Sequence, residues 1–108
     1  MSLYLVRARY TPEAYKGMQV RPGDREAPGR AIFEAAGMKL HHIWFSANGE
    51  VVCIAEGDAV AGATVAMVVT ASGALSNAES LELLTMQQQV EAMKQASKIA
   101  EKYRPPGK

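Results

Sequence analysis

Asn48-Gly49 is the strongest turn signal in the sequence, and it lies between two β-prone segments at residues 38–45 and 51–56. Asn and Gly both tolerate the positive φ angles that a tight two-residue turn requires. The turn therefore predicts a hairpin whose two strands run antiparallel. This hairpin lies near the middle of the chain, so the remaining strands of the sheet must come from the segments on either side of it.

Strand and helix signals continue on both sides of this hairpin. Residues 3–10 alternate in a β-prone pattern, and residues 80–84 are typical of a fourth strand. Thr85 and Gln88 have the spacing of a capping box at the start of a C-terminal helix. The predicted elements, in chain order, are a strand at residues 3–10, a short helical turn at 12–18, a helix that begins with Asp24 as N-cap and ends at Gly37, strands at 38–45 and 51–56, a helix at 59–72 that Asp58 caps, a strand at 80–84 and a helix at 86–103.

This order, β-α-β-β-α-β followed by an extra helix, is the ferredoxin-like split β-α-β arrangement of the α+β class. A chain of 108 residues has the length of one domain, so we assign residues 1–103 to it and residues 104–108 to a C-terminal tail. The predicted strands have apolar residues on both faces, although the helices can cover only one face of the sheet. A second copy of the same sheet is the simplest cover for the other face. The sequence therefore predicts a homodimer, with a higher oligomer left open.

Charge and residue content exclude several classes of function. Twelve basic against eleven acidic side chains give a net charge of +1, which argues against nucleic acid as a partner, since such proteins are usually strongly basic. No apolar run is long enough to span a membrane, and no secretory signal is evident, so we expect a cytoplasmic protein. No glycine-rich phosphate-binding motif occurs, and we expect no cofactor. One cysteine with two histidines is too few for a structural zinc site, so no metal is expected.

Several segments resemble the GYD-domain family over nearly the whole chain, from Leu3 to about Ala96. The family's Gly-Tyr-Asp triplet is the one departure, because this chain has Gly49-Glu50-Val51 there and no Tyr. Either Glu50 stands in for the Asp, or the hairpin is shorter. The segments that carry the resemblance are Tyr4-Leu5-Val6, Tyr10-Thr11-Pro12-Glu13, Asp24-Arg25 with Arg30, Glu34-Ala35-Ala36-Gly37-Met38-Lys39-Leu40, Trp44-Phe45, Ala71-Ser72-Gly73-Ala74-Leu75 and Leu83-Leu84-Thr85.

The resemblance implies a dimeric α+β barrel, in which two ferredoxin-like sheets pack face to face. That superfamily includes cofactor-free monooxygenases, muconolactone isomerase-like enzymes, haem-degrading enzymes, chlorite dismutase-like enzymes and stress-responsive proteins. A fold of this kind hosts many activities, so two functions follow as expectations. The first is binding of a small molecule, with proton transfer or cofactor-free oxidation of that molecule. The alternative is a non-catalytic dimeric binding or stress-associated module.

The two histidines, His41 and His42, are the strongest acid–base candidates, because imidazole titrates near neutral pH. Adjacent residues of a strand point to opposite faces, so the two histidines are predicted to serve different surfaces. His42 shares its predicted face with Leu40 and Trp44. We take His42 as the candidate general acid–base group. The alternative is that each histidine is a hydrogen-bonded structural residue.

The candidate pocket lies between the sheet and the helices. Tyr10 would orient a substrate there, although aromatic residues on strands are mostly core residues. Arg7 and Arg9 share a face of the first strand. There they either point into a solvated centre of the barrel, form ion pairs with acidic residues such as Glu56 or Glu82, or bind an anionic ligand. The residues assigned to the site are His42 and Tyr10 as catalytic groups, and Trp44, Phe33, Arg25 near the pocket mouth, Arg9 and Met67 as ligand-binding groups.

Overall fold

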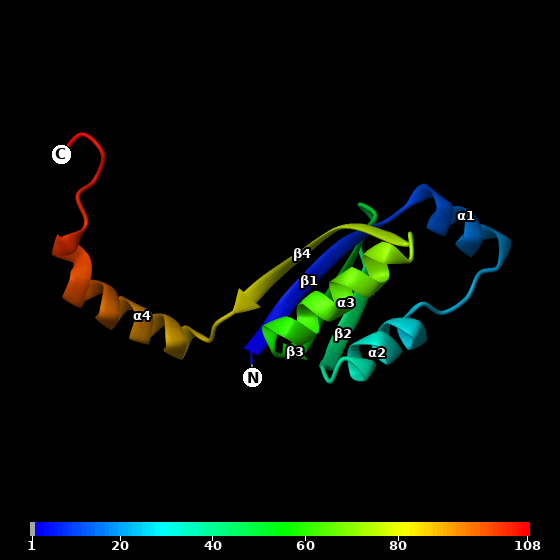
Figure 1. The fold of residues 1–108 in the computed structure, drawn as a ribbon, viewed down its shortest axis with the longest axis horizontal. Coiled ribbons are helices and arrows are strands. Elements are labelled where there is room, and N and C mark those ends of the chain that lie inside the picture. Colours follow the sequence, from blue (N-terminus) through cyan, green and yellow to red (C-terminus); the bar gives the residue numbers. More distant parts are fainter. Residues whose placement is uncertain (1) are drawn as a thin grey trace.

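The sheet of this protein has four antiparallel strands in the order β2-β3-β1-β4, which is the ferredoxin-like order (Figure 1). The computed structural model describes residues 2–108. The strands are β1 (Ser2–Tyr10), β2 (Lys39–Phe45), β3 (Glu50–Gly57) and β4 (Leu75–Leu83), and the helices are α1 (Pro12–Val20), α2 (Glu26–Ala35), α3 (Ala59–Ala71) and α4 (Met86–Ile99), followed by a 3-10 turn, η1 (Ala100–Lys102). The predicted α+β class is therefore confirmed, with α4 as the extra helix.

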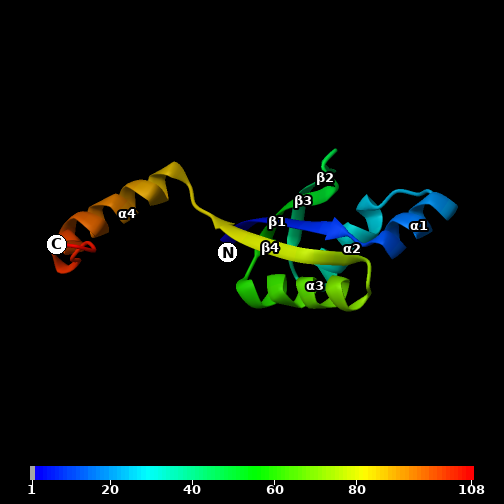
Figure 2. The same ribbon diagram turned by 90° about the horizontal axis from the view of Figure 1, so that it is seen from above.

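Helices α2 and α3 lie on one face of the sheet, and no helix of the described residues covers the other face (Figure 2). The strand β3 shows this difference residue by residue, because Cys53 and Ala55 are buried whereas Val52 and Ile54 are only half-buried. The buried core, between the sheet and the two helices, consists of Phe33, Met38, Leu40, Val51, Cys53, Ala55, Ala61 and Val65. The uncovered side, which we call the open face, consists of Leu3, Leu5, Arg7 and Arg9 of β1, Glu50, Val52, Ile54 and Glu56 of β3, Glu79, Leu81 and Leu83 of β4, and His42 and Trp44 of β2.

Most elements begin within one residue of the predicted start, but the N-cap of α2 and the start of β4 differ from the prediction. The helix α2 begins at Glu26, and Asp24 accepts a hydrogen bond from the Glu26 backbone N–H at 2.8 Å instead of acting as the N-cap. The strand β4 begins at Leu75, well before the predicted start at residue 80, because it pairs with nearly the whole of β1. Asn77, with a φ of 53°, lies where the pairing register of β4 shifts, and this irregularity conceals the first part of β4 in the sequence pattern.

The hairpin between β2 and β3 is antiparallel as predicted, but its turn is longer than the two-residue form. The Ser46 N–H donates to the Glu50 carbonyl at 2.7 Å, and the Gly49 N–H donates to the Ser46 carbonyl at 2.9 Å. These bonds enclose a three-residue loop in which only Gly49 has a positive φ, of 95°. A three-residue loop that ends in a left-handed glycine is a common alternative to the two-residue turn. Gly49 is thus the residue whose conformational freedom the turn requires.

The helix α4 projects away from the rest of the molecule (Figures 1 and 2), and residues 84–108 are all exposed. The predicted capping box at its start is confirmed. The Thr85 hydroxyl accepts from the Gln88 N–H at 3.0 Å, and the Gln88 side chain accepts from the Thr85 N–H at 2.8 Å. The molecule is elongated as a result, with extents of 59, 33 and 24 Å. Within residues 2–108, no helix has the length and apolar character needed to cross a membrane.

Candidate functional site

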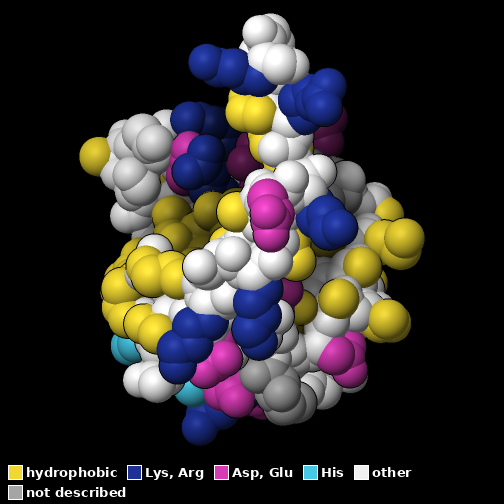
Figure 3. All heavy atoms as spheres, turned by 90° about the vertical axis from the view of Figure 1, so that its left-hand side faces the viewer, with side chains coloured by type: hydrophobic (Ala, Val, Ile, Leu, Met, Phe, Trp, Pro, Cys, Tyr) yellow, Lys and Arg dark blue, Asp and Glu magenta, His cyan; other side chains and the backbone are white. Residues whose placement is uncertain are grey.

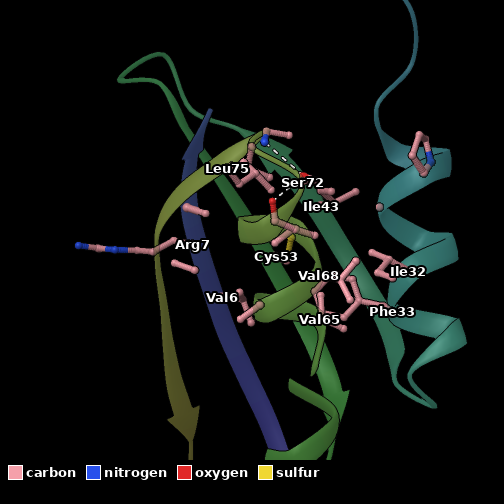
Figure 4. A pocket seen from close by; sticks show the side chains of 18 of the residues that line it. Val6, Arg7, Ile32, Phe33, Ile43, Cys53, Val65, Val68, Ser72 and Leu75 are labelled. Atoms are coloured by element: carbon pink, nitrogen blue, oxygen red, sulfur yellow. Dashed lines mark hydrogen bonds between the residues drawn. The ribbon is translucent and has the colours of Figure 1, made fainter. Parts of the chain in front are cut away.

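A cavity of about 240 Å³ lies between the sheet and the helices α2 and α3 (Figure 4). All four strands and both helices contribute to its wall, and most of the contributed side chains are apolar. Figure 4 shows these side chains directed into the space between β1 and α2, whereas Arg7 points away on the other side of the sheet. The principal apolar wall residues are Val6, Ile32, Phe33, Ile43, Val65 and Leu75.

Two glycines set the shape of this cavity. A Cβ atom at Gly29 of α2 would lie 3.0 Å from the Ile43 Cδ1 atom, so the absence of a side chain allows α2 to approach β2 closely. A Cβ atom at Gly62 of α3 would meet nothing within 4 Å, although Gly62 lines the cavity. The close approach of α2 closes one side of the cavity, and the bare surface of α3 at Gly62 leaves its interior open.

The cavity contains few polar groups. The Ser72 hydroxyl is already engaged, because it donates to the Val69 carbonyl at 2.7 Å and accepts from the Ala74 N–H at 3.2 Å. The two remaining polar groups of interest in the wall are the Tyr10 phenol and the exposed guanidinium of Arg25, which precedes α2. An arginine side chain stays charged under all ordinary conditions. The site therefore combines an apolar interior with a phenol and one permanent positive charge.

Cys53 is a buried part of the same wall, with 6% of its surface exposed. Burial in apolar surroundings raises the pKa of its thiol to about 11. The thiolate is the nucleophilic form of cysteine, so a thiol that stays protonated at neutral pH is a poor nucleophile. Cys53 thus contributes apolar surface to the cavity.

The seven residues assigned to one site from the sequence are divided among three places. Tyr10, Phe33 and Arg25 line the cavity. His42, Trp44 and Arg9 lie on the open face instead. Met67 is 72% exposed on α3 and is not part of the cavity wall. The expectation that His42, Trp44, Arg9 and Met67 would share one pocket with Tyr10 is therefore wrong.

A β-bulge at His41 is the reason that His42 lies on the open face. Leu40 pairs with Ala55 and His42 pairs with Ile54, so His41 is an extra residue in β2. The bulge interrupts the alternation of side chains, and the predicted opposite orientation of the two histidines is wrong. No glycine marks the bulge in the sequence, so alternation alone assigns His42 to the wrong face.

Both histidines have partners on the open face. The Nε2 atom of His41 lies 2.9 Å from the Glu56 Oε1 atom, and this hydrogen bond is the main reason that the pKa of the Glu56 carboxyl is lowered. The His42 ring stacks on the Trp44 ring, with centroids 4.8 Å apart and planes 10° apart. The His41 contact agrees with the structural alternative of a hydrogen-bonded histidine, whereas the contact of His42 is ring stacking.

Arg7 and Arg9 form ion pairs, as one predicted alternative had it, but their partners are Glu50 and Glu79 and not the expected Glu56 or Glu82. The Glu50 carboxylate lies 3.6 Å from both guanidinium groups, and Glu79 lies 3.6 Å from Arg7. Arg9 also donates to the Asn48 carbonyl at 2.8 Å. Glu50 thus joins the hairpin to β1. Within residues 2–108, no group of three His, Cys, Asp or Glu side chains is arranged to hold a metal ion.

Comparison with known proteins identifies a family that the chain matches and solved structures with a similar fold. A family model described as the GYD domain matches residues 4–96. The C-terminal domain of the MgtC protein from Mycobacterium tuberculosis has a similar fold, with a TM-score of 0.50, 10% identity, and coverage of 77% of this chain and 88% of that chain. An uncharacterized NIPSNAP domain protein from Burkholderia xenovorans is 20% identical at a TM-score of 0.44, with coverage of 79% and 94%. A search of curated proteins found no match.

Proposed function

The chain belongs to the GYD domain family, and on that premise we propose that it binds a small, mostly apolar molecule in the cavity between the sheet and the helices α2 and α3. The description of the family names a domain and no reaction, so the proposal depends on the site itself. The observation that carries it is an apolar cavity with few convergent polar groups, which is typical of small-molecule sites.

The size and charge of the cavity limit the class of ligand. A volume of about 240 Å³ equals that of roughly eight liquid water molecules, which suits a ligand of roughly eight to ten non-hydrogen atoms. Burial of an apolar ligand body against Phe33 and Val65 provides most of the affinity. An anionic group on the ligand would face Arg25, because that guanidinium is the charged group of the wall on the helix side. A short-chain or aromatic carboxylate fits both requirements.

Binding of a small molecule, without acid–base catalysis by a histidine, is the function that the cavity supports best. Proton transfer or cofactor-free oxidation, the chemistry expected from the family resemblance, would need an acid–base group beside the ligand. His42, the predicted acid–base group, lies on the open face, and the Cys53 thiol of the wall stays protonated, while Tyr10 is predicted only to orient a substrate. We therefore favour a binding module over an enzyme that uses His42.

We propose that the protein functions as a homodimer in which two open faces pack against each other. Leu3, Trp44 and Leu81 are 38%, 56% and 56% exposed there, which is unusual for large apolar side chains clustered on one face of a sheet. The Arg7–Glu50 ion pair and its neighbours lie toward one end of the face, so the charges there already have partners. The open face of a second copy has the same apolar side chains, and packing the two faces together would cover them.

Binding of octanoate to the full-length chain tests the cavity. Octanoate combines an apolar chain with a carboxylate, and a ligand of its size is expected to bind with a Kd on the order of 0.1–1 mM. Gly62→Leu would place a side chain in the open space of the cavity and should weaken binding by about tenfold or more, measured by calorimetric titration. Gly17→Leu is the matched control, because Gly17 lies on α1, outside the cavity, and also has nothing within 4 Å of its Cβ position.

The charged end of the ligand is tested separately. Arg25→Gln should weaken octanoate binding by about two- to fivefold, as expected for a solvent-exposed ion pair, and should leave octanol binding unchanged. Arg21→Gln should change neither, because Arg21 does not line the cavity. Equal binding to the Gly62→Leu and Gly17→Leu proteins, or no binding of either ligand at millimolar concentration, would contradict the proposed site.

A further inference from the structure

The helix α4 has an apolar side, as helices that pack against a protein surface do, but in the described residues 2–108 all of its side chains are exposed. Met86, Val90 and Met93 recur at helical spacing and form one stripe along it, which we call the α4 stripe. These three side chains are 72%, 42% and 57% exposed. Figure 3 views the molecule from the side on which α4 projects, and hydrophobic side chains lie exposed over much of that side.

A helix of this length is not expected to persist alone. The helix α4 has 14 residues, and isolated helices shorter than about 12–15 residues are marginal in water even when their sequences favour helix formation. The capping box at Thr85 and Gln88 stabilises its first turn but leaves the α4 stripe uncovered. A stable α4 therefore requires another surface over the stripe.

The charge distribution indicates which surface this is. Residues 1–84, which we call the body, hold nine acidic and seven basic side chains, whereas residues 85–108 hold two acidic and five basic ones. The body thus has a net charge of −2 and the C-terminal segment a net charge of +3. Two C-terminal segments repel each other, whereas a C-terminal segment and a body attract each other. Charge complementarity therefore favours contact between the C-terminal segment that contains α4 and a body.

The position of α4 makes the body of a second copy accessible to it. The helix α4 continues in the direction of β4 beyond the end of the sheet, and its first turn lies on the side opposite α3 (Figure 2). That side is the open face, on which the second copy sits in the proposed dimer. Leu83 of the open face is followed by the exposed Leu84, by Thr85 and then by Met86 of the α4 stripe, so the two apolar surfaces are adjacent along the chain.

We propose that α4 is an exchanged arm, which packs the α4 stripe against the body of a second copy of this chain. The partner's body thus covers the α4 stripe. The contact occurs twice in the dimer, because each copy contributes one α4. The inference rests on the proposed homodimer. It adds a second interface between the copies, because the two open faces could pair without α4 taking part. Two exchanged arms would increase the apolar area buried between the copies beyond that of the open faces alone.

Amide hydrogen exchange of the full-length chain, with sedimentation on the same samples, tests the arm. The α4 amides should be protected at concentrations where the dimer forms and should lose protection on dilution to the monomer. Met93→Glu places a charge in the α4 stripe, and it should remove that protection and weaken the dimer by about tenfold or more. Gln95→Glu is the matched control, because Gln95 lies on the opposite side of α4 and receives the same charge.

Four other outcomes would each contradict the proposal that α4 is an exchanged arm. A dimer whose α4 amides exchange as in a free peptide would leave the open-face dimer intact and eliminate the arm. Protection of α4 at every concentration would mean that α4 packs on its own body. A dimer that becomes tighter between about 0.05 and 0.5 M NaCl would indicate pairing of two like-charged arms, since salt screens repulsion. A chain that stays monomeric throughout would eliminate both the dimer and the arm.

Discussion

At the scale of single residues, the Cys53 thiol reports on the integrity of the cavity wall. Burial raises its pKa to about 11, above the ordinary value of 9.0. The neutral thiol therefore contributes stability that is fully present below about pH 9 and is lost as the pH rises from about 9 through 11, because the unfolded chain then releases the proton more readily. We expect urea unfolding to show this loss in the wild type and a flatter profile in Cys53→Ala.

The same burial should make Cys53 inert to a thiol reagent in the folded protein. Reaction with a disulfide reagent at about pH 8 should be at least about a hundredfold slower in the native chain than in the urea-unfolded chain, since the native thiol must first become exposed. The unfolded chain is the control for intrinsic reactivity. Similar rates for the two forms would show that the cavity wall at Cys53 opens freely.

Residue types and spacing predicted part of the site. Tyr10 and Phe33 were correctly placed in the wall, because strand alternation and helical periodicity are undisturbed around them. His42 was placed on the wrong face because a bulge at His41 has no sequence signal. Met67 was misplaced for another reason: α3 is apolar on all sides, so its sequence does not indicate which side faces the sheet.

At the scale of elements, local signals predicted the order and the ends of most strands and helices. The hairpin and the capping box of α4 depend on neighbouring residues, and both are present. The first half of β4 was not predicted, because residues 75–79 are held in the sheet by pairing with β1 and not by their own β propensity. Register shifts in β2 and β4 likewise arise from pairing between strands distant in sequence.

Two glycine substitutions should change stability in opposite directions, according to the packing of the element that holds them. Gly57→Ala at the end of β3 would place a Cβ atom 2.7 Å from the Met38 Cγ atom in the core, and should destabilise the fold by about 1–3 kcal/mol. Gly62→Ala within α3 meets nothing within 4 Å and should stabilise it by about 0.5–1 kcal/mol. Urea unfolding measures both. The same sign for both substitutions would contradict this account of the packing.

At the scale of the whole molecule, the open face and the α4 stripe are two apolar surfaces that nothing in residues 2–108 covers. The helix-covered side of the sheet holds the buried core and the cavity, with Ala55 fully buried. The open face has Trp44 at 56% exposure, and the α4 stripe has Met86 at 72%. Both surfaces adjoin the end of β4. A single chain therefore holds one complete cavity but leaves both of these surfaces for another copy to cover.

A charge on the open face should separate the two copies. Trp44→Glu would replace an exposed apolar ring on that face with a carboxylate, and should weaken the dimer by about tenfold or more, because the charge would be buried against the partner's open face. The unfolding free energy of the diluted monomer should change by less than about 1 kcal/mol, since Trp44 lies outside the buried core. Sedimentation velocity over a concentration series measures the first effect and urea unfolding the second.

Met67→Glu is the matched control for this substitution, because Met67 is 72% exposed on α3, on the other side of the sheet. It introduces the same charge at an apolar position, so a general effect of added charge would appear in both proteins. Octanoate binding should persist in Trp44→Glu, since the cavity lies on the helix-covered side and is complete in one copy. Equal dimerisation of the two variants would argue against the open face as the interface and would leave the cavity as a monomer's binding site.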